Sequence, residues 1–174
     1  NELSLDQKKK LIEELADLGA RSINIVGAGE PTIDPDFFEL LRHIGRFGMT
    51  PIVYTEGALK LADKKFCEKV YDLNATIVLK VNSLRNEAYQ NSILLSGDTK
   101  TKTPRFNYFQ RRKVALENLI DLGFNKPTPT RLAFDTIICR ENLDEIPWLH
   151  RYARDRNIFV LLVNYLPSGR SAGG

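Results

Sequence analysis

Hydrophobic residues recur along the chain at two spacings, one typical of helices and one typical of short strands. Ser4 and Gln7 form a capping-box pattern, and leucine and isoleucine then follow at helical spacing as far as Leu18. Five short runs rich in β-branched and other apolar residues predict strands at about 22–27, 50–55, 75–82, 131–138 and 158–164. The intervening patterns predict helices at about 37–47, 59–73, 106–122 and 142–156, the last of which starts near Asp144 so that Pro147 falls in its first turn.

This order predicts the fold class. Five helices and five strands alternate strictly and begin with a helix, which favours a parallel sheet, because parallel strands need a crossover on each return. The strands are almost continuously apolar, as in sheets that are covered on both faces. A polar stretch from 84 to 103 interrupts the alternation. We therefore predict a single α/β domain over residues 1–174, built on an open doubly wound sheet or on a partial barrel.

Composition narrows the class of protein. The 174 residues are 43% hydrophobic and 27% charged, which is typical of a globular domain. A net charge of +3 is too small to indicate nucleic-acid binding, and no apolar run approaches the roughly 18 residues that span a membrane. Cys67 and Cys139 lie far apart, so we expect two buried thiols in a cytoplasmic protein. The single methionine is Met49 and the chain begins with Asn1, so we expect a piece of a longer protein.

Polar residues gather where the predicted strands end, which is the edge that carries the site in parallel α/β folds. The first of these ends reads Gly-Ala-Gly-Glu-Pro over residues 27–31. Its glycines let the backbone approach a ligand closely, and the Glu30 carboxylate suits an ammonium group. The segment is neither a dinucleotide fingerprint nor a P-loop. A tight turn with a surface glutamate explains the same residues, and both interpretations stay open.

These residues carry a family resemblance. Ala28-Gly29-Glu30-Pro31 resembles the Gly-Gly-Glu motif of radical S-adenosylmethionine (radical SAM) enzymes, with alanine in place of the first glycine. Thr55-Glu56-Gly57 is similar to the Thr-Asn-Gly that ends their third strand, and Asn82-Ser83-Leu84 resembles the Ser-Leu-Asp that ends their fourth. Residues 139–146 and 166–170 resemble the segments after their fifth and sixth strands. Five short motifs in the same order strengthen one another.

The resemblance implies a partial (β/α)6 barrel whose first strand is missing from this chain, with SAM and a [4Fe–4S] cluster at its open end. It also implies a set of SAM-binding residues. These are Ala28, Gly29 and Glu30 at the ammonium group, Ser83 with Asn82 at the carboxylate or ribose, Thr55 along the same pocket, Asn164, Tyr165 and Leu166 near the adenine, and Lys80, with Arg105 as second candidate, at the carboxylate.

The sequence departs from the family at the cluster. The Cys-x-x-x-Cys-x-x-Cys loop that follows the family's first strand is absent, and Cys67 and Cys139 do not replace it, because three thiolates must converge on one cluster. We expect no metal ligand in this chain, which alone would be inactive. A longer parent would cleave SAM reductively, with electrons from a donor such as ferredoxin or flavodoxin, and so start the radical modification of a peptide or a small molecule.

Two other functions stay open. A non-radical α/β-barrel enzyme would use Glu30, Asp135 or Glu56 as acid–base groups or metal ligands, and a cluster-free relative would only bind a ligand or partner. Asp135 is also a candidate substrate contact, although a surface acid at a strand end explains it as well. The basic stretch 98–113 is interpreted either as a solvated face or as a contact for a substrate or partner peptide.

Overall fold

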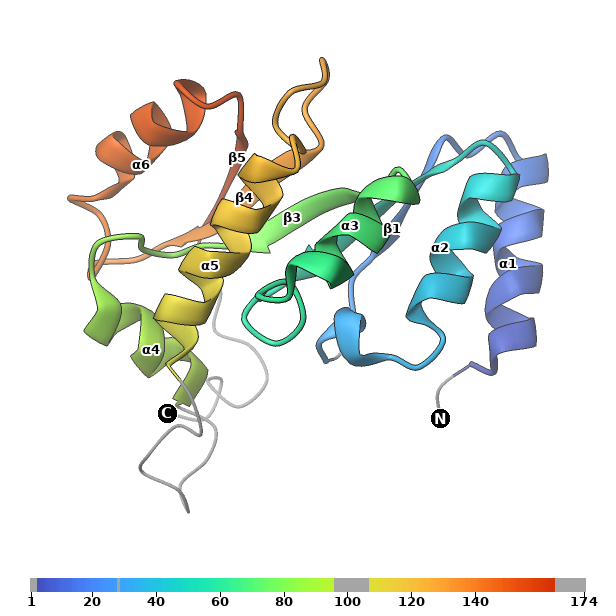
Figure 1. Cartoon of the computed structure of the whole chain (residues 1–174), viewed down its shortest axis with the longest axis horizontal. Coiled ribbons are helices and arrows are strands. Elements are labelled where there is room, and N and C mark those ends of the chain that lie inside the picture. The colour runs from blue at the N-terminus through green and yellow to red at the C-terminus, as the bar shows by residue number, and fades with distance from the viewer. Residues whose placement is uncertain (1–2, 28, 96–106, 165–174) are drawn as a thin grey trace.

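The computed structural model describes residues 3–27, 29–95 and 107–164 (Figure 1). The strands form one parallel sheet in the order β1-β2-β3-β4-β5, open at both edges, so the predicted α/β fold with parallel strands in a partial barrel is confirmed. In chain order the elements are α1 (Leu5–Asp17), β1 (Ser22–Ile25), the 3-10 helix η1 (Pro31–Ile33), α2 (Phe37–Arg46), β2 (Thr50–Thr55), α3 (Lys64–Asp72), β3 (Thr76–Lys80), α4 (Glu87–Leu95), α5 (Tyr108–Asp121), β4 (Leu132–Ile138), α6 (Ile146–Arg154) and β5 (Phe159–Asn164).

The predicted strict alternation is wrong between β3 and β4, where two helices follow one another. α4 lies inside the polar stretch 84–103 that we expected to interrupt the pattern. The Asn86 side chain accepts a hydrogen bond from the Tyr89 N–H at 3.0 Å and caps the start of this helix. A capping signal was therefore present in the sequence, although the apolar residues around it do not form a clear helical stripe.

The helix predicted at 59–73 begins only at Lys64. The Asp63 side chain caps α3 by accepting from the Lys65 N–H at 2.9 Å. The residues before it form a turn instead of a helix, because the Glu56 carboxylate accepts the backbone N–H groups of Ala58 and Leu59, both at 3.1 Å. A side chain thus binds the donors of this segment and delays the helix.

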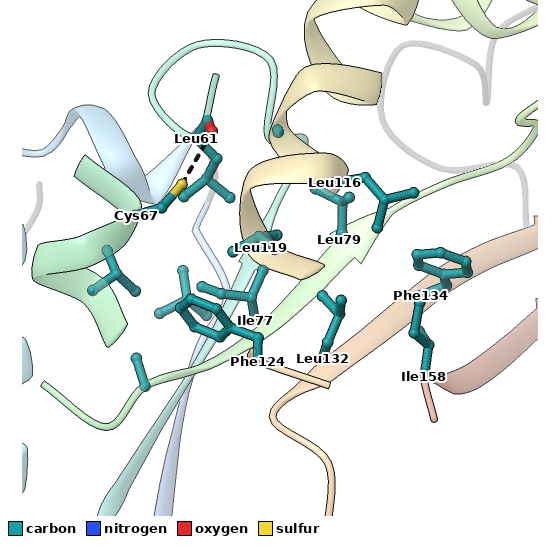
Figure 2. Close-up of a cluster of buried hydrophobic side chains, with 14 of the residues drawn as sticks. Leu61, Cys67, Ile77, Leu79, Leu116, Leu119, Phe124, Leu132, Phe134 and Ile158 are labelled. Carbon is teal, nitrogen blue, oxygen red and sulfur yellow. Dashed lines mark hydrogen bonds between the residues drawn. The ribbon is translucent and has the colours of Figure 1, made fainter. Parts of the chain in front are cut away.

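Helices cover one face of the sheet. Figure 2 shows Leu116 and Leu119 of α5 packed over side chains of β3 and β4. Each fully buried aliphatic or aromatic side chain in such a core contributes about 1.5–3 kcal/mol. On this face the three central strands bury Val53, Ile77, Leu79, Leu132 and Phe134 completely.

The opposite face of the sheet is more polar. Register places Lys80 of β3 beside Asp135 of β4 on that face, and both side chains are partly exposed. The expectation of strands buried on both faces is wrong for the edge strands: β1 is half exposed, and Phe159 of β5 is 61% exposed. Each edge strand has a neighbour on one side alone, which explains the exposure. No helix of the described residues has the length and apolarity needed to cross a membrane.

Gly57, in the turn after β2, gives a test of this packing. Its φ of +81° favours glycine, and a Cβ built on it would lie 2.3 Å from Leu79 Cδ1. We expect Gly57→Ala to lower the free energy of unfolding by about 2–4 kcal/mol, because strained backbone and overpacking add. The measurement is urea unfolding, with Gly45→Ala in α2 as control, since a Cβ there meets nothing within 4 Å. Equal stability of the two variants would contradict the account.

Candidate functional site

The carboxylate of Glu30 joins the loop after β1 to the turn after β2. Its Oε1 accepts three hydrogen bonds, from the Thr32 N–H at 3.1 Å, the Thr32 hydroxyl at 2.6 Å and the Thr55 hydroxyl at 2.6 Å. Its Oε2 accepts one, from the Glu56 N–H at 2.9 Å. Since a carboxylate oxygen offers two lone pairs, Oε1 is saturated within the protein and Oε2 keeps acceptor capacity for a further donor.

Thr55 is a support for Glu30. Its side chain is 4% exposed and in register with Leu79, so it lies on the helix-covered face of the sheet. Its hydroxyl donates to Glu30 and accepts from the Gly57 N–H at 3.0 Å. The hydrogen-bonding groups of Thr55 are therefore occupied inside the protein, where they fix the position of the carboxylate.

Glu56 places a second carboxylate beside the first. Burial raises the pKa of Glu56, and the nearby Glu30 charge raises it further, whereas the Arg112 charge and the hydrogen bonds from the backbone N–H groups of Ala58 and Leu59 lower it. Arg112 of α5 donates from Nε to the Glu56 carbonyl at 2.9 Å, and its Nη2 lies 4.0 Å from Glu56 Oε2. Two acidic side chains, Glu30 and Glu56, and the buried guanidinium of Arg112 thus meet at the turn after β2.

A second polar network joins the loop after β3 to α6. The Ser83 hydroxyl, 1% exposed, donates to Glu145 Oε2 at 2.5 Å and accepts from the Asn86 N–H at 2.8 Å. The Leu84 N–H donates to Glu145 Oε1 at 2.9 Å. Gln90 Oε1 accepts the backbone N–H of Ser83 at 3.0 Å and that of the preceding residue at 2.9 Å. Ser83 is therefore held firmly at the carboxyl end of β3.

Two asparagines connect β3 to β4. Asn82 Oδ1 accepts the Ile137 N–H at 2.9 Å. The Asn142 amide donates to the carbonyl oxygens of Asn82 and Ile137, at 2.9 and 2.8 Å, and its Oδ1 accepts the Cys139 N–H at 2.9 Å. One buried side chain therefore satisfies three backbone groups of two neighbouring strand ends.

The other predicted site residues lie at the same edge of the sheet where the structure describes them. Gly29 is exposed beside Glu30, Lys80 is the last residue of β3, and Asn164, the last residue of β5, is in register with Ile138. Strand carboxyl ends of a parallel sheet share one edge, so the structure places Gly29, Glu30, Thr55, Lys80, Asn82, Ser83 and Asn164 along that edge, with Thr55 and Lys80 on opposite faces of the sheet. Ala28, Tyr165, Leu166 and Arg105 lie outside the described residues.

Several important residues were not predicted as site residues. Gln90, Asn142 and Glu145 carry the network behind Ser83; Gln90 lies outside every motif, and the motif at 139–146 contains Asn142 and Glu145 without assigning them a role. Arg112 belongs to the basic stretch 98–113, which we interpreted as a solvated face or a partner contact. That interpretation is wrong for Arg112, whose side chain is 2% exposed, while residues 98–106 lie outside the described part of the chain.

The two cysteines occupy different environments. Cys67 is fully buried, and its thiol donates to the Leu61 carbonyl (Figure 2), so burial raises the pKa of Cys67 to about 12. The expectation of a buried thiol is wrong for Cys139, which is partly exposed after β4 and contacts the Tyr89 hydroxyl. Within the described ranges, no group of three or more His, Cys, Asp or Glu side chains could hold a metal ion. These residues do not fit a [4Fe–4S] cluster.

A groove of about 810 Å³ meets this edge at one end. Gly27, Gly29 and Glu30 border it, but most of its lining is apolar and comes from α1, β1, α2 and the segment between β1 and α2. Ile23 and Ile25 are part of that lining and also pack against the small core between α1 and α2. The polar side chains of the candidate site therefore lie at the strand ends, whereas the groove lies along the open edge of β1.

Comparisons with known proteins agree with this architecture. The chain is 28% identical over 178 residues to the mycofactocin maturase MftC of Mycolicibacterium smegmatis, covering 98% of this chain and 39% of that protein. It is 26% identical to an S-adenosylmethionine-dependent nucleotide dehydratase of Flammeovirga pacifica, covering 82% and 44%. The structure of Streptococcus suis SuiB bound to S-adenosylmethionine matches with a TM-score of 0.71 at 17% identity, covering 98% of this chain and 36% of that one.

The chain thus spans about two fifths of the length of these curated relatives. No protein-family model matches it. The likeness to SuiB shows the fold of the chain. The two relatives found by sequence support the family resemblance that the motifs carry. The resemblance to the radical SAM superfamily is confirmed by these relatives, and the chain has an α/β fold with a partial barrel similar to that of SuiB.

Asn142 gives a test of the network that holds the strand ends. We expect Asn142→Ala to lower the free energy of unfolding by about 2–4 kcal/mol, because three backbone groups lose their partner. Denaturant unfolding measures this, with Glu141→Ala, at the exposed neighbouring position, as the matched control. A loss no larger than that of the control would show that the network does not hold the loops.

Proposed function

We propose that residues 1–174 form one SAM-binding domain of a radical SAM enzyme, with Glu30 as the acceptor for the ammonium group of SAM. The observation that carries the proposal is the unequal use of the two Glu30 oxygens. Oε1 is held by three donors, so the carboxylate cannot rotate freely, while Oε2 accepts one bond and keeps capacity for a further donor. A charge-assisted hydrogen bond to an ammonium is among the stronger polar contacts in proteins.

The backbone beside Glu30 suits close approach of a ligand. A Cβ built on Gly29 meets nothing within 4 Å, so the chain leaves open space at this position. Gly29 and Ala28 would add backbone contacts to the same ammonium group. Thr55 would act from behind the pocket, since its hydroxyl already holds Glu30.

Other strand ends would bind the rest of the ligand. Lys80 supports a contact with the SAM carboxylate, because it ends β3 on the face opposite the helices. Asp135 is its register neighbour and would orient the substrate. Asn82 and Ser83 would shape the loop beside the carboxylate or ribose, and Asn164, with Tyr165 and Leu166, would line the adenine.

Reductive cleavage of SAM is chemistry supplied by a [4Fe–4S] cluster, which needs three converging thiolates. Cys67 and Cys139 do not supply them, so we propose that the cluster belongs to a longer protein, as does its electron donor, a ferredoxin or flavodoxin. A peptide substrate is supported by SuiB, which has been solved with its precursor peptide SuiA; a small molecule is the other class that we propose. The free thiols fit a reducing compartment such as the cytoplasm.

Calorimetric titration with SAM tests the proposal on the chain as it exists. We expect Glu30→Gln to bind SAM at least ~10-fold more weakly than wild type, because hydrogen bonds to charged groups contribute about 1.5–3 kcal/mol. Glu68→Gln, at an exposed site on α3, is the control and should leave the affinity unchanged. Absence of SAM binding to wild type, or equal affinities of wild type and Glu30→Gln, would overturn the proposal.

A further inference from the structure

Two carboxylates meet at the turn after β2: Glu56 belongs to this turn, and Glu30 reaches it from the loop after β1. The Glu56 N–H donates to Glu30 Oε2, so the two acidic side chains are tied to one backbone segment, and the Glu30 charge raises the pKa of Glu56. Glu56 occupies the place of the neutral asparagine in the Thr-Asn-Gly motif that this turn resembles. An asparagine would need no counter-charge here, whereas a partly buried glutamate does.

Arg112 supplies that counter-charge from α5. Its side chain is 2% exposed, and burial lowers the pKa of Arg112 to about 10, which leaves it charged at neutral pH. Nη1 and Nη2 are buried with no hydrogen-bond partner among the described residues, and the contact between Nη2 and Glu56 Oε2 is a 4.0 Å ion pair. A buried guanidinium is costly, and an apolar side chain would fill the same space at less cost. The charge itself is therefore the useful property of Arg112.

The charge of Arg112 affects the position of Glu30 through Glu56 and the turn after β2. An ionised Glu56 accepts the N–H groups of Ala58 and Leu59, which closes the turn. The closed turn holds the Glu56 N–H against Glu30 Oε2. Protonated Glu56 has one acceptor fewer and must itself donate, so the turn loosens when its charge is lost.

We propose that Arg112 is a positioning residue for the ammonium-binding carboxylate: its charge keeps Glu56 ionised, and the turn that Glu56 closes aligns Glu30 Oε2 with the ligand. The inference rests on the proposed function, because it assigns Arg112 a role in SAM binding. The groups that face Glu56 are Glu30 from the β1 loop and Arg112 from α5. Arg111 binds the same turn, donating to the carbonyls of Ala58 and Leu59 at 2.7 and 3.2 Å.

The test compares Arg112→Met, Arg112→Lys, Glu56→Gln and the double variant Arg112→Met/Glu56→Gln by calorimetric titration with SAM between pH 5.5 and 7.0. In this range the ligand keeps its ammonium charge, since an α-amino group titrates near 7.7–8.0. We expect Arg112→Met to bind at least fivefold more weakly at pH 5.5 than at pH 7.0, because Glu56 takes up a proton. Wild type, Arg112→Lys and the double variant should each change less than twofold over the range.

A direct measurement accompanies the titration. The pKa of the Glu56 side chain, followed by ¹³C NMR without SAM, should rise by one unit or more in Arg112→Met and stay near the wild-type value in Arg112→Lys. If Arg112→Met does not fold, Arg112→Lys decides the matter. A tenfold or greater loss of SAM affinity in Arg112→Lys would overturn the proposal.

The outcomes separate the two proposals. A wild-type chain that does not bind SAM overturns the proposed function, and the NMR titration then still reports whether Arg112 controls Glu56. A wild-type chain that binds SAM, together with equal and pH-independent losses in Arg112→Met and the double variant, would show that Arg112 acts through packing alone and would overturn this inference.

Discussion

The arrangement of the strand ends depends on the Glu30 carboxylate, which accepts four hydrogen bonds from two neighbouring loops. Through Thr32 and Thr55 it fixes the β1 loop against the end of β2, so that one carboxylate oxygen is saturated and the other keeps acceptor capacity. The same contacts include the cap of the 3-10 turn at Pro31, and the acceptor capacity left on Oε2 is the ground on which we propose the ligand-binding interpretation of the glycine-rich segment.

Next to this edge the protein uses polar side chains where an ordinary core would use apolar ones. The buried Asn142 and Gln90 and the partly buried Glu145 together satisfy backbone groups of the loops after β3 and β4. Each such group would cost free energy if it were buried without a partner, so these side chains hold irregular loops in one conformation. The helix-covered core below supplies most of the stabilisation, and the polar networks give the loops their shape.

The sequence predicted the strands within about two residues, because apolar runs between turn residues are a strong local signal. It predicted the edge that carries Glu30, Thr55 and Ser83, since parallel strands place their carboxyl ends together. It did not predict α4 or the late start of α3, which depend on side chains that compete for backbone donors. It also missed the burial of Arg112, since the charge of a basic stretch says nothing about which residue turns inward. The hydrogen bond from Arg112 to the Glu56 carbonyl joins residues more than fifty positions apart, and no local pattern in the sequence indicates it.

The central claim is that SAM binds at the carboxyl edge of the sheet, against Glu30. The most direct test is an ¹⁵N-resolved NMR titration of the chain with SAM, following each backbone amide. The account predicts the largest shifts at Gly29, Thr32, Glu56 and Gly57, with smaller ones at the ends of β3 and β5. Shifts confined to the apolar groove between α1 and α2, or to the amino ends of the strands, would contradict it.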